Sequence, residues 1–563
     1  MNIIMESHMD ASTSVSSTVL SVENLTIETA KTAGTPLVRN VSFNVRSGET
    51  VCIVGESGSG KSVTSLAIMG LLPKGGLCVT QGKIIVDGED LLEATPKRMR
   101  QLRATRIAMV FQEPMTALNP VQRVGKQIDE VLRLHTPLKH AARKEKILAM
   151  LERVRLPDVS RIYDAFPHEL SGGQRQRIVI AMALILRPRL LIADEPTTAL
   201  DVTTQKEILS LIRELQDQAS TAVIFITHDF GVVSDIADRV VVMNRGSLVE
   251  ANTRQVILES PQEAYTRMLV SSVPSLQPRH TSAPDRERVL EVIGLDKRYE
   301  ERRLIKPHRT VNAASNVSFS VGKGEITGII GESGSGKTTV ARCVIRLLDP
   351  SSGSIFLNGD DLARQKDLHA VRKRVQYIFQ DPYRSLNPRR TVGQSIIEGL
   401  VNYGMTVKDA MRKAASTMEL VGLSAEMLNR YPHQFSGGQR QRICIARAVV
   451  MEPDLLVADE AVSALDVSVQ AQVLKLFEEI RDVTGAAILF ITHDLRVAAQ
   501  ICNTIVVMQQ GSVIEAGDAT QILLSPQQEY TRKLIDAAPA SHWDFQNFRP
   551  IRESPSQLRL QSH

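Results

Sequence analysis

Two glycine-rich stretches of this sequence have the residue types and spacing to hold phosphate groups. Residues 55–62 read GESGSGKS and residues 331–338 read GESGSGKT, each after a short apolar run. Such a loop wraps backbone N–H groups around phosphates at the start of a helix, and its glycines permit positive φ and leave room for the ligand. Lys61 and Lys337 would neutralise phosphate charge, and Ser62 and Thr338 would ligate Mg²⁺ through their hydroxyls. We therefore predict two phosphate cradles.

The cradle residues are all candidates for nucleotide binding. They are Gly55, Glu56, Ser57, Gly58, Ser59, Gly60, Lys61 and Ser62 in the first stretch and Gly331, Glu332, Ser333, Gly334, Ser335, Gly336, Lys337 and Thr338 in the second.

Two acidic pairs stand where an apolar run ends, in LLIADE at 190–195 and LLVADE at 455–460. In open α/β sheets, ligands lie at the carboxyl ends of the strands. Asp194 and Asp459 would hold Mg²⁺ through water, and Glu195 and Glu460 would orient or polarise the attacking water. Such a pair alone is weak evidence, because many strand ends are simply solvated. The phosphate cradles favour the catalytic interpretation.

Two further polar residues extend each predicted site. Gln112 and Gln380 follow apolar runs, and a neutral amide there can touch both Mg²⁺ and the attacking water. His228 and His493 stand at the ends of the predicted strands 223–227 and 488–492. A lone histidine at a strand end is more often structural, but its recurrence after the acidic pair favours a contact with the γ-phosphate.

The sequence contains an internal repeat. Five blocks of one half recur in the same order in the other, among them the cradles and the acidic pairs. Strands are predicted at 50–54, 190–193 and 222–226, and again at 326–330, 455–458 and 487–491. Strands that alternate with helices indicate a parallel sheet covered on both faces. The predicted domains are a tail at 1–18, a first domain at 19–270, a proline-rich exposed linker at 271–288, a second domain at 289–538 and a tail at 539–563.

Composition agrees with a globular protein of more than one domain. The chain has 563 residues, of which 43% are hydrophobic and 23% are charged. Its longest apolar run, 178–186, is about half of what a membrane-spanning helix needs. The net charge of +5 does not argue for nucleic acid, and the five cysteines lack the spacing of a zinc or redox motif.

A second repeated block carries a resemblance to a known family. SGGQ followed by RQR comprises Ser171, Gly172, Gly173 and Gln174 in the first half and Ser436, Gly437, Gly438 and Gln439 in the second. This block resembles the signature of ATP-binding-cassette proteins. A serine and glycine N–H groups at a helix N-terminus also make an anion site for a γ-phosphate.

The resemblance implies a fold, cofactors and an arrangement. The fold is α/β, with two P-loop NTPase cassettes in tandem, each a RecA-like core with a helical subdomain and an antiparallel β subdomain. The implied cofactors are ATP and Mg²⁺, and the cassettes are expected to pair within the chain, each ATP lying between the cradle of one and the SGGQ of the other. Cassettes usually offer an aromatic ring to adenine; Tyr299 fits that position, whereas Thr29 at the matching place does not, so the first cassette is expected to hold ATP less tightly.

Narrower features resemble the ATPases of oligopeptide, dipeptide and nickel importers. They are FQEPMTALNP and FQDPYRSLNP after each glutamine, and the endings SPQEAYTRMLVSSVP and SPQQEYTRKLIDAAP, although the usual His-Pro of that ending is absent. This resemblance implies an energy-coupling subunit, fused from two ATPases, of an importer for peptides or related small solutes. Its partners would be two membrane permeases and an external solute-binding protein, at the cytoplasmic face of the inner membrane. The helical segments 117–166 and 386–431 would receive the permeases.

Some relatives bind an iron–sulfur cluster after this ending, and because no cysteine follows Cys502 we expect none here. Two alternatives stay open. One is a soluble tandem cassette acting on ribosomes or nucleic acid, which usually has a charged inter-domain helix or zinc cysteines. The other is an exporter ATPase, against which the peptide-importer ending argues.

Overall fold

The computed structural model describes residues 17–30, 36–112, 117–197, 200–279, 287–301, 309–362, 364–463 and 465–551. Parts of the predicted tails and linker, and 113–116 of the FQEPMTALNP stretch, lie outside these residues. The chain divides into two compact units. The first comprises 1–198, 210–227 and 236–254, and the second comprises 199–209, 228–235 and 255–563. The domain bounds read from the sequence stay a prediction.

The first unit is built on a mostly parallel sheet in the order β10-β9-β3-β8-β7-β6. The strands are β3 (Thr50–Val54), β6 (Ile107–Val110), β7 (Leu190–Asp194), β8 (Ala222–Ile226), β9 (Arg239–Asn244) and β10 (Ser247–Thr253). Every residue of β3, β7 and β8 is buried, as expected for strands covered on both faces. The predicted parallel sheet is confirmed, and β10 adds an antiparallel edge.

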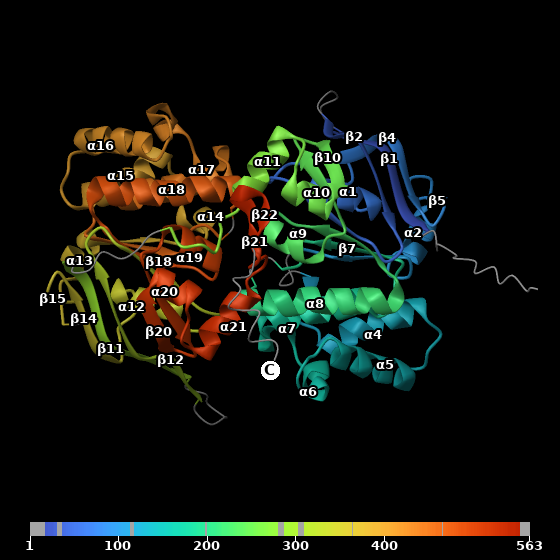
Figure 1. Ribbon diagram of the computed structural model, residues 1–563, viewed down its shortest axis with the longest axis horizontal. Coiled ribbons are helices and arrows are strands. Elements are labelled where there is room, and N and C mark those ends of the chain that lie inside the picture. The colour runs from blue at the N-terminus through green and yellow to red at the C-terminus, as the bar shows by residue number, and fades with distance from the viewer. Residues whose placement is uncertain are drawn as a thin grey trace, which may run out of the picture. The chain divides into compact units, whose positions relative to one another are not determined.

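A separate antiparallel sheet and a group of helices complete this unit. The sheet, in the order β2-β1-β4-β5, consists of β1 (Thr18–Thr29), β2 (Pro36–Arg46), β4 (Leu77–Val86) and β5 (Glu89–Asp90). The helices are α1 (Lys61–Ile68), α2 (Pro96–Leu102), α4 (Val124–His135), α5 (His140–Arg153), α6 (Val159–Asp164), η1 (Pro167–Glu169), α7 (Gly172–Leu184) and α8 (Val202–Ala219). Helices α4, α5 and α6 gather beside α7 (Figure 1), so the predicted helical segment 117–166 is confirmed as helical.

The second unit repeats this plan. Its mostly parallel sheet, β16-β17-β18-β13-β19-β20, contains β13 (Ile326–Ile330), β16 (Val375–Ile378), β17 (Leu455–Asp459), β18 (Ala487–Ile491), β19 (Thr504–Gln509) and β20 (Ser512–Asp518). Its antiparallel sheet, β12-β11-β14-β15, contains β11 (Arg288–Glu301), β12 (Arg309–Gly322), β14 (Ser352–Leu357) and β15 (Asp360–Asp361).

The helices of the second unit follow the same order as those of the first. They are α12 (Lys337–Val344), α13 (Leu368–Arg374), α14 (Pro382–Ser385), α15 (Val392–Asn402), α16 (Val407–Leu420), η2 (Ala425–Asn429), η3 (Pro432–Gln434), α17 (Gly437–Val449), α18 (Val467–Thr484), α19 (Leu495–Ile501), α20 (Ala519–Leu524) and α21 (Glu529–Ala537). Three earlier helices also lie wholly or largely in this unit: α9 (Phe230–Ile236), α10 (Arg254–Glu259) and α11 (Ala264–Ser271).

Two segments are better packed than the sequence indicated. Val273 and Leu276, inside the predicted exposed linker, are buried, and Leu276 belongs to the core of the second unit. In the predicted C-terminal tail, β21 (Trp543–Asp544), η4 (Phe545–Asn547) and β22 (Arg549–Pro550) form a small hairpin with Phe545 buried. For these residues, the prediction of an exposed linker or a loose tail is wrong, because their large apolar side chains are buried against the rest of the fold.

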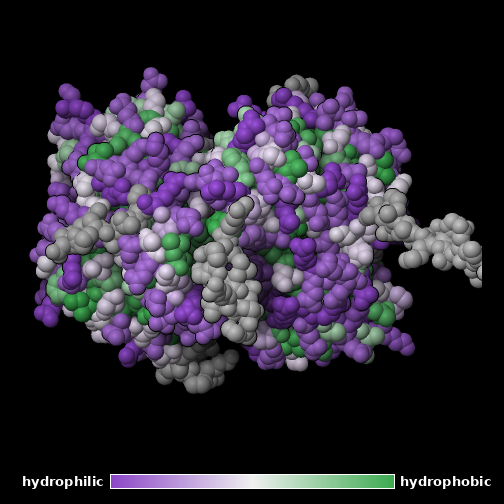
Figure 2. Space-filling view, viewed as in Figure 1, coloured by the Kyte–Doolittle hydropathy of each residue, from purple (hydrophilic) through white to green (hydrophobic). Residues whose placement is uncertain are grey.

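The face drawn in Figure 2 is largely hydrophilic, with hydrophobic residues in small groups. Among the described residues, no helix combines the length and apolar character that crossing a membrane requires.

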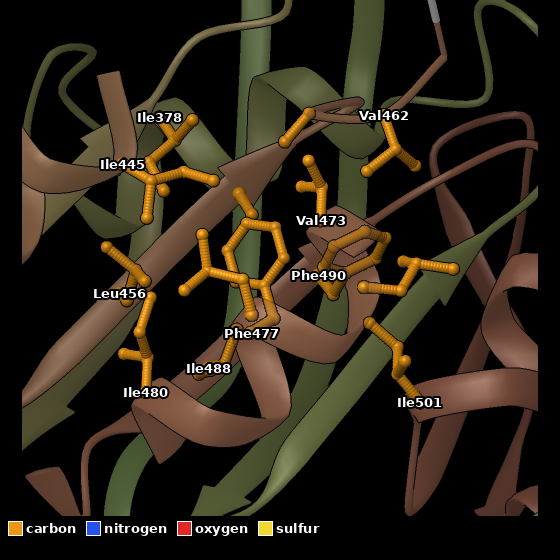
Figure 3. Packing of buried hydrophobic residues seen from close by; sticks show 14 of the residues in the cluster. Ile378, Ile445, Leu456, Val462, Val473, Phe477, Ile480, Ile488, Phe490 and Ile501 are labelled. Carbon is orange, nitrogen blue, oxygen red and sulfur yellow. The ribbon is translucent and has the colours of Figure 1, made fainter. Parts of the chain in front are cut away.

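The second unit is held by a core between its parallel sheet and α17–α19. Phe477 of α18 and Phe490 of β18 meet edge to face, with ring centroids 5.4 Å apart. Leu456 of β17 and Ile488 of β18 lie around them (Figure 3). The sheet that carries the acidic pair, at the carboxyl end of β17, is therefore fixed by large interdigitated side chains.

Phe477→Ala should lower the stability of the second unit by about 3–5 kcal/mol, because it leaves a cavity at a fully buried site. Thermal unfolding followed by circular dichroism measures this. Val483→Ala on the same helix is the control, because Val483 is 71% exposed and its truncation should cost no more than about 0.5 kcal/mol. Equal shifts in the two variants would contradict the packing described.

Candidate functional site

Each phosphate cradle joins the end of one parallel strand to the start of a helix. In the first unit β3 leads through 55–60 into α1, and in the second β13 leads through 331–336 into α12. Gly331 has φ 149°, and a Cβ there would lie 2.2 Å from the carbonyl oxygen of Met508. Glycine is needed at this turn for its backbone conformation and for lack of space.

The lysine of each cradle is buried and folded back onto its own loop. Lys337 Nζ donates to the carbonyl oxygens of Gly331 (2.7 Å) and Glu332 (2.8 Å). Lys61 makes the same two bonds to Gly55 and Glu56, at 2.7 and 2.9 Å. Burial lowers the pKa of Lys337 against the opposing pull of Glu460 and Asp459. A buried ammonium held by carbonyl oxygens is suited to receive phosphate oxygens.

The predicted magnesium ligands meet in pairs. Ser62 Oγ donates to Asp194 Oδ1, and Thr338 Oγ1 donates to Asp459 Oδ1, each at 3.2 Å. Burial raises the pKa of Asp194 to about 6, and it also raises the pKa of Asp459. These carboxylates are therefore held in an environment that disfavours their own negative charge.

A hydroxyl beside a carboxylate is an all-oxygen donor set, which is what Mg²⁺ prefers. The burial of Asp194 and Asp459 agrees, because a buried carboxylate is stabilised by a nearby cation. The residues present therefore fit Mg²⁺: Ser62 and Asp194 would hold it in the first unit, and Thr338 and Asp459 in the second.

The predicted catalytic glutamates follow directly and are bound by the predicted glutamines. Gln112 Nε2 donates to Glu195 Oε2 at 2.8 Å, and Gln380 Nε2 donates to Glu460 Oε2 at 2.6 Å. Glu195 and Glu460 have φ of 47° and 49°, a left-handed conformation that is costly for a residue with a side chain. Such strain is typical of functional positions. The glutamines thus contact the carboxylate rather than standing apart from it.

His493 joins the site of the second unit. Its Nδ1 lies 3.3 Å from Glu460 Oε1. Burial alone would raise the pKa of Glu460, but the hydrogen bond and charge of His493 outweigh it and lower that pKa. Burial would lower the pKa of His493, but Glu460 raises it instead. The pair is therefore stabilised as imidazolium and carboxylate. His228 follows β8 as His493 follows β18, at the matching place of the first repeat.

One residue of the second site escaped the sequence reasoning. The hydroxyl of Tyr377, in β16, donates to Asp459 Oδ2, and burial raises the pKa of Tyr377 so that it stays protonated. The matching position of β6 in the first repeat is Met109. Aligning the two repeats could have identified Tyr377, because the hydroxyl of a tyrosine inside an apolar strand usually needs a polar partner.

The signature residues form caps at the starts of their own helices, α7 and α17. Ser171 Oγ accepts from Gln174 N (3.3 Å) while Ser171 N donates to Gln174 Oε1 (3.1 Å). Ser436 and Gln439 form the same capping box. Both serines are exposed. Each signature serine is thus fixed by hydrogen bonds at the start of its own helix, and its side chain lies at the surface rather than in the core.

Tyr299, the expected adenine platform, lies on β11 and is 39% exposed, with Lys297 Nζ 5.4 Å from its ring centroid. Its role toward adenine stays a prediction, as does the weaker binding expected from Thr29.

Comparison with protein families finds two matches, each repeated along the chain. The model described as "ABC transporter" matches residues 38–198 and 314–463. The model described as "Oligopeptide/dipeptide transporter, C-terminal region" matches 249–305 and 514–561. These ranges contain the predicted cradles, the acidic pairs and the SPxxxYT endings.

Curated relatives match along nearly the whole chain. The "Glutathione import ATP-binding protein GsiA" of Shigella dysenteriae serotype 1 is 45% identical over 584 residues, covering 96% of this chain and 92% of its own. The protein of the same name from Escherichia coli K12 has the same identity and coverage. A solved chain described as a dimeric bacterial ABC transporter cassette is 30% identical, covers 42% of this chain and 98% of its own, and has a TM-score of 0.37.

Asp194→Asn should make the nucleotide-free protein more stable than the parent at pH 7.5. This gain in stability should shrink as the pH falls toward 4. Asp194 has a pKa raised from 3.8 to about 6 by burial, so the unfolded state releases the proton first and stability falls as pH rises through this window. The difference in free energy of unfolding at pH 7.5 should be about 1–3 kcal/mol.

Melting temperature against pH measures this effect. Asp217→Asn on the exposed side of α8 is the control and should follow the parent at every pH. A loss of stability in Asp194→Asn at pH 7.5 would show that the carboxylate is not under strain.

Proposed function

Since this chain belongs to the ABC transporter family and is an ATPase that drives transport, we propose that it is the energy-coupling subunit of an importer for short peptides or glutathione-like solutes. The observation that carries the proposal is that each half combines a match to the ABC transporter model, which contains a predicted hydrolysis site, with a match to the oligopeptide-type ending. We further propose two membrane permeases and an external solute-binding protein as partners, and a peripheral position at the cytoplasmic face of the inner membrane. The pairing of the cassettes around two nucleotides stays a prediction.

The protein's own groups account for the steps of hydrolysis. In each cradle the buried lysine exchanges its two carbonyl partners for phosphate oxygens, and the loop N–H groups surround the same phosphates. Ser62 with Asp194, and Thr338 with Asp459, would hold Mg²⁺, which would offset the negative charge that develops on the phosphates. Because the loop is formed in advance, binding costs little further ordering.

The second unit also has the groups that direct water. Glu460 is kept ionised by His493, so it can accept a hydrogen bond or a proton from the attacking water. Gln380 fixes the other oxygen of the same carboxylate. The glutamate therefore has one oxygen toward the histidine and one toward the amide, and its orientation is set from two sides.

Replacing Glu195 and Glu460 together by Gln should reduce ATP turnover at least about 100-fold while binding of a fluorescent ATP analogue changes only a few-fold, because the acid acts on water rather than on the phosphates. Glu452→Gln is the control: Glu452 has a similar positive φ of 52° but its side chain is 72% exposed. Undiminished hydrolysis in the double variant would refute the catalytic assignment.

The transport role is tested with partners and cargo. A tagged chain, purified from membranes of its native host, should carry two permeases with it, and deletion of its gene should abolish uptake of labelled dipeptide or glutathione. Recovery with ribosomes, or uptake that is unaffected with both solutes, would contradict the proposal.

A further inference from the structure

The ending SPQQEYT of the second repeat contains a tyrosine to which none of the catalytic assignments gives a role. Tyr530 lies on α21, and its Oη accepts a hydrogen bond from the backbone N–H of Glu332 at 3.2 Å. Glu332 is the second residue of the phosphate cradle. A side chain from the C-terminal region therefore touches the loop that holds the nucleotide.

The peptide bonds around Glu332 connect this tyrosine to the cradle lysine. On the carbonyl side of the same residue, Glu332 O accepts from Lys337 Nζ at 2.8 Å. The loop cannot easily shift at its start, because Gly331 is closely packed against Met508. Tyr530 thus fixes the residue whose carbonyl sets the position of the lysine.

Helix α21 is built to hold the tyrosine in place. Glu515 of β20 accepts from Thr531 Oγ1 (2.6 Å) and from the backbone N–H groups of Gln527 (2.8 Å) and Gln528 (3.2 Å). Burial acts to raise the pKa of Glu515, but these hydrogen bonds outweigh it and lower that pKa. A carboxylate with three donors at the start of the helix is a strong anchor.

The other side of α21 is packed into the core of the second unit. Leu534 and Ala537 are buried there, and the ring of Tyr530 packs against the same cluster. Burial raises the pKa of Tyr530 to about 12, so the hydroxyl stays neutral under physiological conditions. Both the ring and the hydroxyl are therefore fixed before any nucleotide binds.

We propose that Tyr530 is a positioning residue for the nucleotide of the second cassette, through which the C-terminal region preorganises the phosphate cradle. This inference rests on the proposed ATP-binding function. It gives the repeated SPxxxYT ending a task inside its own cassette, and Tyr265 stands at the matching place of the first repeat. Loss of the hydroxyl leaves the ring packing intact but frees the Glu332 peptide.

The test uses the full chain with Lys61→Ala, so that binding of a fluorescent ATP analogue with Mg²⁺ reports on the second cradle. In this background Tyr530→Phe should weaken affinity about 3- to 10-fold, the effect of one hydrogen bond, with the melting temperature essentially unchanged. Tyr403→Phe is the matched control: the Tyr403 hydroxyl also bonds main chain, donating to His369 O at 2.6 Å, but Tyr403 directly follows α15 and lies outside the cradle.

Thr531→Val separates positioning from simple loss of structure. It removes a donor from Glu515, so it should lower the melting temperature more than Tyr530→Phe does while weakening affinity less. Equal affinity in Tyr530→Phe and its parent, or the same loss in Tyr403→Phe, would overturn the role of Tyr530. Failure of the Lys61→Ala parent to bind nucleotide would instead overturn the proposed function of the second site.

Discussion

The arrangement depends on charges buried at the carboxyl ends of parallel strands. Lys337 and Asp459 are about 5% exposed, and each is held by neutral partners: carbonyls for the lysine, hydroxyls for the aspartate. Burial removes the solvation that water would give these groups, and hydrogen bonds from neutral partners replace only part of it. A polyanion with a divalent cation would supply more, the phosphates to the ammonium and the cation to the carboxylate. The buried β-strands and the packing of Phe477 and Phe490 serve to keep these charges where water cannot relieve them.

Both repeats bury charged groups in this way, but the neighbours of the buried aspartate differ between them. Asp459 accepts from Tyr377 in addition to Thr338, whereas the first repeat has Met109 at the matching position. A second hydrogen-bond donor stabilises the ionised carboxylate and so opposes the effect of burial. Asp459 has this second donor and the aspartate of the first repeat does not have it from the matching position. The two repeats share the residues predicted to bind nucleotide and differ at a neighbour that supports one of them.

Much of the site could be predicted from sequence because local spacing determines it. The cradles and the acidic pairs each lie within one strand–loop–helix junction, and each signature block lies at the start of its own helix, so chain connectivity already brings the atoms together. Strand and helix periodicity likewise gave the parallel sheets, since buried strands such as β8 and β18 are continuous apolar runs.

Contacts between distant segments were not predictable in this way. Tyr377 reaches Asp459 and Tyr530 reaches Glu332 across long stretches of chain, and nothing in the local pattern of either tyrosine names its partner. The same holds for Val273 and Phe545, whose burial depends on surfaces formed elsewhere. Proline-rich or terminal position predicts exposure only when the residues carry no large apolar side chain.

The strained glutamates show how the local and the distant contacts meet. Glu460 adopts a left-handed backbone directly after β17, a cost that the end of the strand must sustain. Its N–H donates to the carbonyl of Ile491 in β18, which fixes the turn, and its two carboxylate oxygens are taken by Gln380 and His493. These three partners come from two strand ends of one sheet: Gln380 follows β16, and Ile491 and His493 lie at the end of β18. The carboxylate can therefore keep a costly conformation because the sheet constrains it from several directions. Any movement of one strand end relative to the other must change the geometry of the residue that we predict directs water.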